Sequence, residues 1–242
     1  MKQVADGVYR LGSDRINFYL VAEGESLTVV DTGLPGYFDQ LPAGVAELGR
    51  STGDVEAIVL THNHSDHVGF AERLRTMGPP VYIHEVDAPG ATGAARVPQP
   101  KGRVRDLLKP GIVTFLGHAM RNNGLKYPKI SEVTTYADAD MLDVPGHMKV
   151  VFTPGHSPGH CALLMEDRGV LISADGLVTL TPWTGESGPQ LMKINADFDR
   201  ARRSLDIYER LEADVLLPGH GNPWTGGVPT AARRARERSS TR

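Results

Sequence analysis

The sequence predicts a mixed α/β fold built from two similar halves. Three short apolar segments near the N-terminus, separated by charged or glycine-containing turns, are typical of a strand meander. The middle of the chain then alternates strand-like and helix-like segments, as mixed α/β proteins do. A second group of strand-like segments and a helical one follow near the C-terminus. These observations indicate two α/β halves stacked together.

Length and composition favour one domain over residues 1–242. A chain of 242 residues that is 40% hydrophobic can bury one substantial core. We find no repeat, no low-complexity stretch and no long linker rich in Ser, Gly or Pro. We therefore expect one compact unit with a single insertion at about 88–134.

Hydrophobic spacing assigns the elements of the first half. Apolar residues in 37–48 recur at helical spacing and stop near Gly49, which suits the end of a helix. A second helix is expected at 70–77. Strands are expected at 7–11, 17–22, 27–30, 55–60 and 81–83.

The strand and helix rhythm breaks down at about 88–134. This segment carries five of the chain's prolines and scattered glycines, which predicts loops and short helices. Long irregular stretches in compact domains are usually functional loops or disordered segments. We favour a lid over the substrate pocket.

The second half repeats the pattern of strands and a helix. Strands are expected at 148–152, 162–165, 170–173 and 215–217, with a helix at 198–211. The last ten residues hold a basic cluster, which predicts a solvated, partly frayed helix end and leaves an interaction tail as the alternative. Its members are Arg233, Arg234, Arg236, Arg238 and Arg242.

Charge and composition disfavour several classes of protein. A net charge of −3 gives no overall attraction for nucleic acid or anionic membranes, so neither partner is expected. No apolar segment approaches the ~20 residues that span a bilayer, and residues 1–7 do not resemble a secretory signal. The single cysteine, Cys161, is expected to be a buried strand residue. We therefore expect a cytoplasmic protein.

Polar chemistry is concentrated directly after the strand expected at 55–60. Residues 61–67 read Thr-His-Asn-His-Ser-Asp-His, which places three imidazoles and one carboxylate within six residues. These are the ligands that borderline divalent metals such as zinc prefer. A solvated polar turn is the alternative, but it gives no reason for four metal-type ligands in one loop. His62, His64, Asp66 and His67 are therefore candidate ligands.

Three further candidates follow later apolar segments. His156, Asp175 and His220 each come after a strand-like run and lie beside glycine, which lets the backbone approach a shared centre. We expect these side chains to converge with the loop at 61–67.

The His-x-His-x-Asp-His run followed by single His, Asp and His residues resembles the metallo-β-lactamase-fold hydrolase superfamily. The resemblance extends from Gly7 to Gly221. It implies an αββα four-layer sandwich with two metal ions at one edge of the sheets. By position, His62, His64 and His156 would hold one metal, Asp66, His67 and His220 the other, and Asp175 would bridge them. Asp31 matches a position that supports the ligand loop.

Several other residues receive weaker predictions. His160 would support the metal ligands or simply be buried in the following strand. His118 and Trp183 are candidates for substrate contact, His118 from the lid and Trp183 from an apolar wall. Leu177, Leu180 and Met192 would complete that wall, or the same residues would be core or a homodimer contact.

The resemblance also implies a mechanism. Two divalent ions about 3.5–4 Å apart hold a hydroxide that exists at neutral pH and attacks a carbonyl carbon. Asp66 would orient this nucleophile and pass a proton to the leaving group. We expect Zn²⁺, with Mn²⁺, Fe²⁺ or Co²⁺ as alternatives, and a small-molecule carboxylic ester, lactone or thioester as the substrate.

Relatives within the superfamily differ around the metals. Asp175 stands where secreted β-lactamases typically carry Cys or Ser. Only 22 residues follow His220, fewer than a glyoxalase II would need, and Val178 replaces the Tyr of many lactonases. A metal-dependent phosphodiesterase and an iron-dependent sulfur-oxidising oxidoreductase stay open as alternatives.

Overall fold

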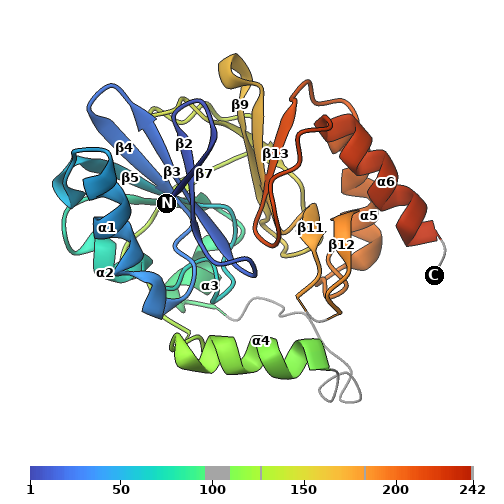
Figure 1. The fold of residues 1–242 in the computed structure, drawn as a ribbon, viewed down its shortest axis with the longest axis horizontal. Helices are drawn as coiled ribbons and strands as arrows, with labels where there is room; N and C mark the ends of the chain where they lie inside the picture. Colours follow the sequence, from blue (N-terminus) through green and yellow to red (C-terminus); the bar gives the residue numbers. More distant parts are fainter. Residues whose placement is uncertain (96–109, 126, 183, 241–242) are drawn as a thin grey trace.

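Two β-sheets pack face to face, and helices cover both outer faces (Figure 1). The computed structural model describes residues 1–95, 110–125, 127–182 and 184–240. The fold class expected from the resemblance, an αββα sandwich, is confirmed. Within these ranges, every helix is too short or too polar to span a lipid bilayer.

The first sheet has seven strands whose spatial order follows the chain. The first four strands form an antiparallel meander, and the fourth to seventh pair in parallel. The strands are β1 (Lys2–Ala5), β2 (Val8–Gly12), β3 (Asn17–Glu23), β4 (Ser26–Val30), β5 (Val55–Leu60), β6 (Val81–His84) and β7 (Thr134–Tyr136).

The second sheet has four strands in the order β13-β10-β9-β8. Its strands are β8 (Lys149–Phe152), β9 (Cys161–Met165), β10 (Val170–Ala174) and β13 (Val215–Pro218). A separate two-stranded ribbon contains β11 (Val178–Leu180) and β12 (Ser187–Gln190). Cys161 is buried in β9, as expected.

Alternating side chains on the strands create three apolar layers. In β3, Phe18 and Leu20 pack with residues of α1 (Gln40–Glu47) and α2 (Ala71–Arg75), whereas Tyr19 and Val21 pack between the sheets. The second sheet packs in the same way against α5 (Phe198–Tyr208) and α6 (Val228–Ser240). Because successive strand residues face opposite sides, one sequence pattern fills both layers.

The first long helix begins later than the expected 37–48. Pro35–Tyr37 forms a short 3-10 turn, and α1 runs from Gln40 to Glu47. Pro42 is the reason, because it has no N–H to donate to the carbonyl four residues earlier. It is tolerated only in the first turn of a helix.

The basic C-terminal segment is more ordered than expected. Residues 228–240 form α6, whose Ala231, Ala232 and Ala235 are buried. Arg236 forms ion pairs with Asp206 and Glu209 of the neighbouring region of α5, at 2.5 and 2.7 Å. The expected helix end is present and exposes Arg233, Arg234 and Arg238, but it is helical as far as Ser240 instead of frayed. Arg242 lies outside the described residues.

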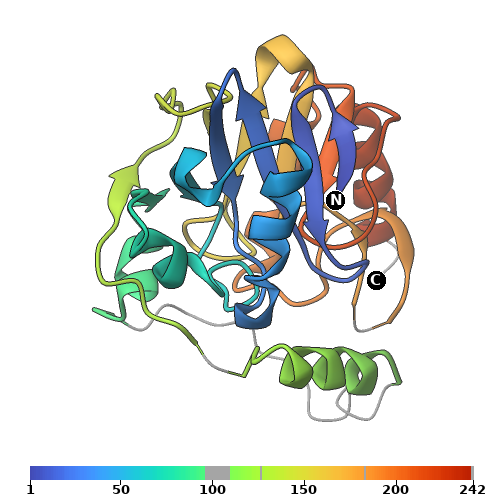
Figure 2. The same cartoon turned by 60° about the vertical axis from the view of Figure 1, so that its left-hand side comes forward.

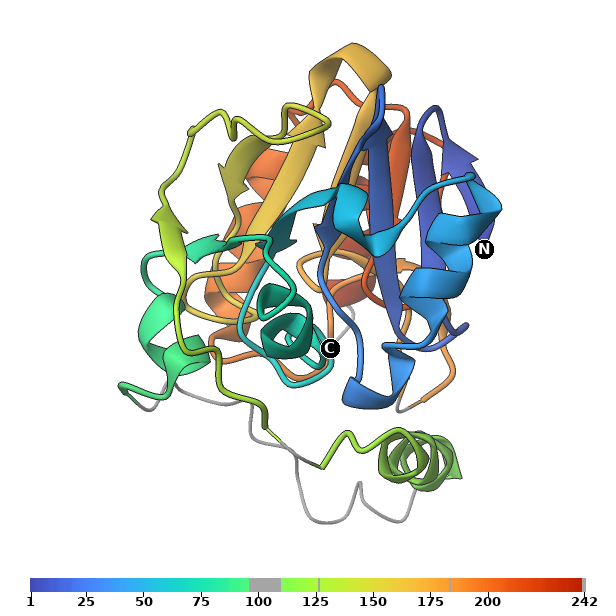
Figure 3. The same ribbon diagram turned by 90° about the vertical axis from the view of Figure 1, so that its left-hand side faces the viewer.

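The insertion at about 88–134 contains two helices among its described residues. These are α3 (Ala88–Thr92) and α4 (Pro110–Arg121). Figures 2 and 3 show α4 as a separate layer at one end of the sandwich. The strand β7, at the end of this segment, was not expected, because it is only three residues long and mostly exposed.

Candidate metal centre

The seven predicted ligands lie on four loops at one edge of the sandwich. The loops follow β5, β8, β10 and β13, and each begins where an apolar strand ends. The structure places the ligand atoms in groups within 4.8 Å of one another. These groups are His62, His64 and His156; His62, His67 and Asp175; and Asp66, His67 and His220.

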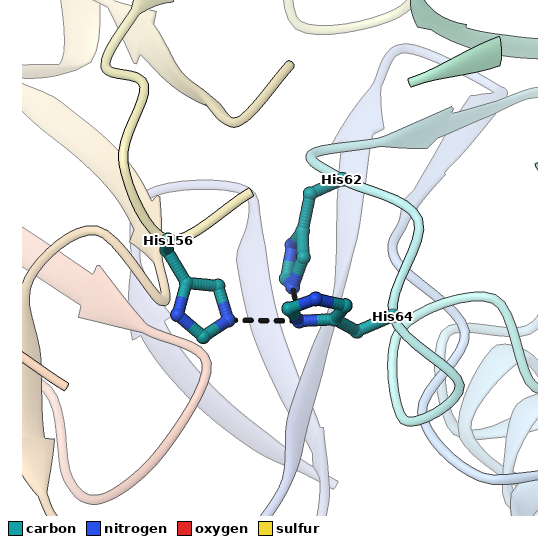
Figure 4. Close-up of side chains that lie close together, drawn as sticks. All are labelled: His62, His64 and His156. Atoms are coloured by element: carbon teal, nitrogen blue, oxygen red, sulfur yellow. Dashed lines mark hydrogen bonds between the residues drawn. The ribbon is translucent and has the colours of Figure 1, made fainter. Parts of the chain in front are cut away.

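The first triad brings three imidazoles together from two loops (Figure 4). Nδ1 of His64 lies 3.1 Å from Nε2 of His62 and 2.8 Å from Nε2 of His156. All three residues are buried. The triad therefore has the composition of a nitrogen-rich metal site.

The second triad lies beside the first, with Asp175 between them. Nε2 of His220 is 3.6 Å from Oδ2 of Asp66 and 3.1 Å from Oδ2 of Asp175. The same Asp175 oxygen is 3.2 Å from Nε2 of His156, and its other oxygen is 3.4 Å from Nε2 of His67. One carboxylate thus faces ligands of both triads, which is the position expected of a bridging group.

The hydrogen bonds around the ligands fix which nitrogen faces the centre. Asp31 accepts a hydrogen bond from Nδ1 of His67 at 2.7 Å and from the Thr61 hydroxyl at 2.9 Å. Because that hydroxyl donates to Asp31, its oxygen accepts the Nδ1 proton of His62, 3.0 Å away. Nε2 of His62 and Nε2 of His67 are then the ring nitrogens that face the centre.

On the other loops, one amide oxygen and one backbone oxygen face the Nδ1 atoms of His156 and His220. Nδ1 of His156 lies 3.3 Å from the side-chain oxygen of Asn195, whose amide nitrogen donates to the Met192 carbonyl. Nδ1 of His220 donates to the carbonyl of Arg15. Nε2 of His156 and Nε2 of His220 consequently face the centre as well.

These ring nitrogens provide the test of whether a metal fits. Nδ1 of His64 carries one proton at most, so it cannot donate to Nε2 of both His62 and His156, which lie 3.1 and 2.8 Å away. In addition, Nε2 of His67 and Oδ1 of Asp175 are buried without a hydrogen-bond partner. Buried polar atoms in that state are costly unless a cation satisfies them. The residues therefore fit a metal centre.

The electrostatics of the ligands agree with cation binding. Burial, together with neighbouring imidazoles, holds the pKa of His62 and of His64 well below its usual value, so both are neutral. Burial would raise the pKa of Asp175, but His220 and His67 outweigh it and hold the pKa well below normal. Burial lowers the pKa of His67 and of His220, but the charges of Asp175 and of the other nearby carboxylates outweigh burial and raise both. Asp175 is therefore an anion that already attracts positive charge to the centre, which suits a divalent ion.

His160 and a neighbouring glycine position Asp175. The backbone N–H of Gly176 donates to Nε2 of His160 at 3.0 Å, and burial lowers the pKa of this histidine to about 3. At Gly219, an added Cβ would lie 2.2 Å from Oδ1 of Asp175. His160 thus contacts the residue that follows Asp175, and its supporting role stays a prediction.

Asp87 is a supporting residue that sequence reasoning did not identify. Its buried carboxylate accepts hydrogen bonds from the N–H groups of Asn63 and Gly159, at 3.1 and 2.7 Å, and from the Ser157 hydroxyl at 2.6 Å. Asn63 lies between two ligands, and the other two residues follow His156 on its loop. Asp87 therefore ties the two loops of the first triad together.

A cavity of about 150 Å³ lies against the ligands. His64, Asp66, His156, Asp175 and His220 line its polar side. The apolar side is formed by Leu34, Phe115, Ala119, Met192 and Ile194. The cavity is therefore a small apolar pocket with metal-type ligands on one wall.

The other predicted substrate contacts have different placements. Nε2 of His118 lies 2.5 Å from the hydroxyl of Tyr37, and His118 is not among the residues lining the cavity. Leu177 packs in the core beneath α5 and α6 instead of lining the pocket. Trp183 lies outside the described residues.

A four-layer αββα sandwich with such a cluster at its edge defines a class of metal-dependent hydrolases. The chain belongs to the metallo-β-lactamase superfamily, because the family model with this description matches residues 11–220.

Curated relatives agree with this assignment. The chain is 28% identical over 237 residues to "Probable metallo-hydrolase YflN" of Bacillus subtilis, a match that covers 93% of this chain and 87% of that protein. "Probable metallo-hydrolase YqgX" of the same organism is 25% identical, covering 87% of each chain. The coarse function, a metallo-hydrolase, follows from these matches and the family.

Solved structures match almost the whole fold. The metallo-β-lactamase family protein TTHA1429 from Thermus thermophilus superposes with a TM-score of 0.72 at 25% identity, covering 99% of this chain and 81% of that one. The subclass B3 metallo-β-lactamase BJP-1 of Bradyrhizobium japonicum has a TM-score of 0.69 at 22% identity, covering 99% and 91%. The likeness to BJP-1 shows the shared fold alone.

Proposed function

We propose that this chain is a dinuclear zinc hydrolase that cleaves a small carboxylic ester, lactone or thioester. The observation that carries the proposal is the position of the Asp175 carboxylate, which faces His156 and His220 at 3.2 and 3.1 Å from opposite triads. Two triads joined by one carboxylate suit a pair of ions rather than one. His62, His64 and His156 would hold the first ion, and Asp66, His67 and His220 the second.

Two zinc ions held there would supply a hydroxide at neutral pH and polarise the substrate carbonyl. Asp66 is the ligand best placed to move a proton. Its side chain is 19% exposed, whereas those of Asp175 and His220 are at most 3% exposed, and it lines the cavity. A carboxylate that reaches both the centre and the cavity is suited to transfer a proton to a leaving group.

The cavity supports an uncharged acyl substrate. Its apolar wall is formed by aliphatic, methionine and phenylalanine side chains, and no Lys or Arg is found among its described lining residues. Phosphodiesters carry a charge that such a wall does not satisfy, which is the reason to prefer a carbonyl substrate.

We also propose a cytoplasmic location, supported by the single buried cysteine.

Metal analysis of protein purified without added metal tests the number and identity of the ions. Two zinc ions per chain, with turnover of lactones, aryl esters or thioesters, is the expected result. Turnover of bis-p-nitrophenyl phosphate alone would favour the phosphodiesterase. One iron per chain with oxygen uptake would favour the sulfur-oxidising oxidoreductase.

Variants connect this activity to the centre. Asp66→Asn keeps the size of the side chain and removes its proton-accepting charge, so hydrolysis should fall by about 10²–10⁴-fold. Asp54→Asn is a matched control, because Asp54 lies at the surface away from the centre, where its carboxylate bonds to Ser51. Full activity of Asp66→Asn with unchanged metal content contradicts the proposed role.

A further inference from the structure

Helix α4 supplies one wall of the cavity beside the metal ligands. Phe115 is buried on this helix, and its ring lies edge-on to the imidazole of His220, with 6.5 Å between the ring centroids. Ala119 follows about one helical turn later, on the same face. Both residues line the cavity. The helix, which forms a separate layer in Figure 3, therefore reaches the ligands through this face.

One end of the apolar wall is formed by very small residues. Ala119 presents a single methyl group, and Gly124 lines the cavity without a side chain. A Cβ atom at Gly124 would lie 2.8 Å from Cδ2 of Leu34 and 3.2 Å from Cβ of Ala119, so the three residues meet there. Leu34 and Ala119 are only 1 and 6% exposed. The room at this end of the cavity therefore depends on the absence of a larger side chain.

We propose that Ala119 determines the size of the acyl group that the enzyme accepts. This inference rests on the proposed hydrolysis of a carbonyl substrate. Asp66 is 19% exposed and would pass its proton to a leaving group on the open side of the cavity. The acyl group then lies on the buried side, against Leu34 and Ala119. A longer side chain at position 119 would occupy the same space.

The volume of the cavity limits the acyl group to a compact one. About 150 Å³ is the size of an apolar protein cavity that holds one benzene molecule. A butyryl, hexanoyl or benzoyl group has a suitable size, whereas a decanoyl group would have to leave its outer methylenes in water. Apolar pockets discriminate by about tenfold or more for one methylene that they cannot place. The structure thus favours short acyl chains over the long chains of lipids.

A series of p-nitrophenyl esters tests the proposal with the metal-loaded full chain. The series contains the acetate, butyrate, hexanoate, octanoate and decanoate. We expect kcat/KM to be highest for the butyrate or hexanoate and at least about tenfold lower for the decanoate.

Two substitutions should move this preference in opposite directions. Ala119→Leu should lower kcat/KM for the hexanoate by about tenfold or more and leave the acetate nearly unchanged. Leucine is a good helix former, so α4 should be retained, and Ala119→Val should give the same change to a smaller degree. Ile194→Ala enlarges the cavity and should move the preference towards the octanoate.

The matched control is Thr114→Leu, which adds the same side chain to the exposed side of α4 and should keep the wild-type profile. Circular dichroism and bound metal should be the same in all variants. The proposal is overturned if Ala119→Leu and Ala119→Val both keep the wild-type profile, or if kcat/KM of the wild type rises steadily up to the decanoate. An unchanged preference of Ile194→Ala also overturns it, because the acyl group would then lie outside this cavity.

Binding of alkyl hydroxamates separates this inference from the proposed reaction. Calorimetry should show that hexanohydroxamate binds the wild type about tenfold more tightly than Ala119→Leu, while acetohydroxamate binds both equally. This pattern without turnover of any ester would refute the proposed hydrolysis and support the role of Ala119. Equal affinities of the two proteins for hexanohydroxamate would refute that role even if esters are hydrolysed.

Discussion

The carboxylate of Asp31 lies 2.7 Å from Nδ1 of His67 and so fixes the direction of that imidazole. Asp31 itself has a left-handed backbone conformation with a φ of 57°, at the end of β4. Its other contacts are with the backbone and hydroxyl of Thr61. One residue outside the ligand set thereby orients the loop that supplies most of the ligands.

Substitution Asp31→Ala should weaken metal binding while leaving every ligand in place. Removing a carboxylate behind a ligating histidine typically lowers metal affinity by about 10–100-fold. Competition with a chromogenic chelator measures this change. Asp54→Ala is the control, since Asp54 forms a capping box with Ser51 in a 3-10 turn that is separate from the ligand loops. Equal metal affinity of the two variants would show that Asp31 does not tune His67.

Substitution Asp87→Ala should destabilise the protein. It leaves the N–H groups of Asn63 and Gly159 and the hydroxyl of Ser157 without their acceptor. Each buried donor left unsatisfied costs about 1–3 kcal/mol, so a loss of about 3 kcal/mol or more in the free energy of unfolding is expected. Urea unfolding of the metal-loaded protein measures it. An unfolding free energy within about 0.5 kcal/mol of the wild type, as for an ordinary surface substitution, would contradict the tie between the loops.

Asp87 shows why part of the site could not be predicted from sequence. The ligand loop was recognisable because His62, His64, Asp66 and His67 are adjacent in the chain. The partners of Asp87 lie 24, 70 and 72 residues away, so its position in the chain does not connect it to the ligand loops. Its role arises only from the tertiary fold.

The strands show the same division between local and tertiary information. The segment that forms β5 is a run of apolar residues, and its limits were predicted as 55–60, as observed. By contrast, β12 reads Ser-Gly-Pro-Gln, which predicts a turn. It pairs only with β11 in a two-stranded ribbon, where a proline is tolerated because no second neighbour needs its missing N–H.

Protonation of Glu72 should account for part of the stability that the protein loses in acid. Hydrogen bonds from Arg75 and Ser131 lower the pKa of Glu72 from 4.5 to about 2. The unfolded chain therefore takes up this proton first as the pH falls, so the stability that Glu72 contributes is fully present above pH 4.5 and is lost towards pH 2. Between these values the wild type should lose more stability than Glu72→Gln, as measured by urea midpoints. The exposed Glu212→Gln should follow the wild type; identical slopes for all three would rule out this contribution.

The contact between His118 and Tyr37 should hold α4 against the sandwich. Nε2 of His118 is 2.5 Å from the Tyr37 hydroxyl, which also lies 2.8 Å from the Ser13 hydroxyl. Because His118 is on α4 and Tyr37 precedes α1, the contact joins the predicted lid to the body of the protein. Tyr37→Phe removes the hydroxyl and keeps the ring.

Loss of one hydrogen bond of about 1 kcal/mol should speed amide hydrogen exchange in residues 110–121 of this variant about fivefold. Thr114→Val is the control, since the Thr114 hydroxyl bonds only to the Gly111 carbonyl within the helix. Equal exchange in α4 of Tyr37→Phe and of the wild type would contradict this prediction. The helix would then be held by its other buried residues, such as Phe115 and Ala119, which also line the cavity.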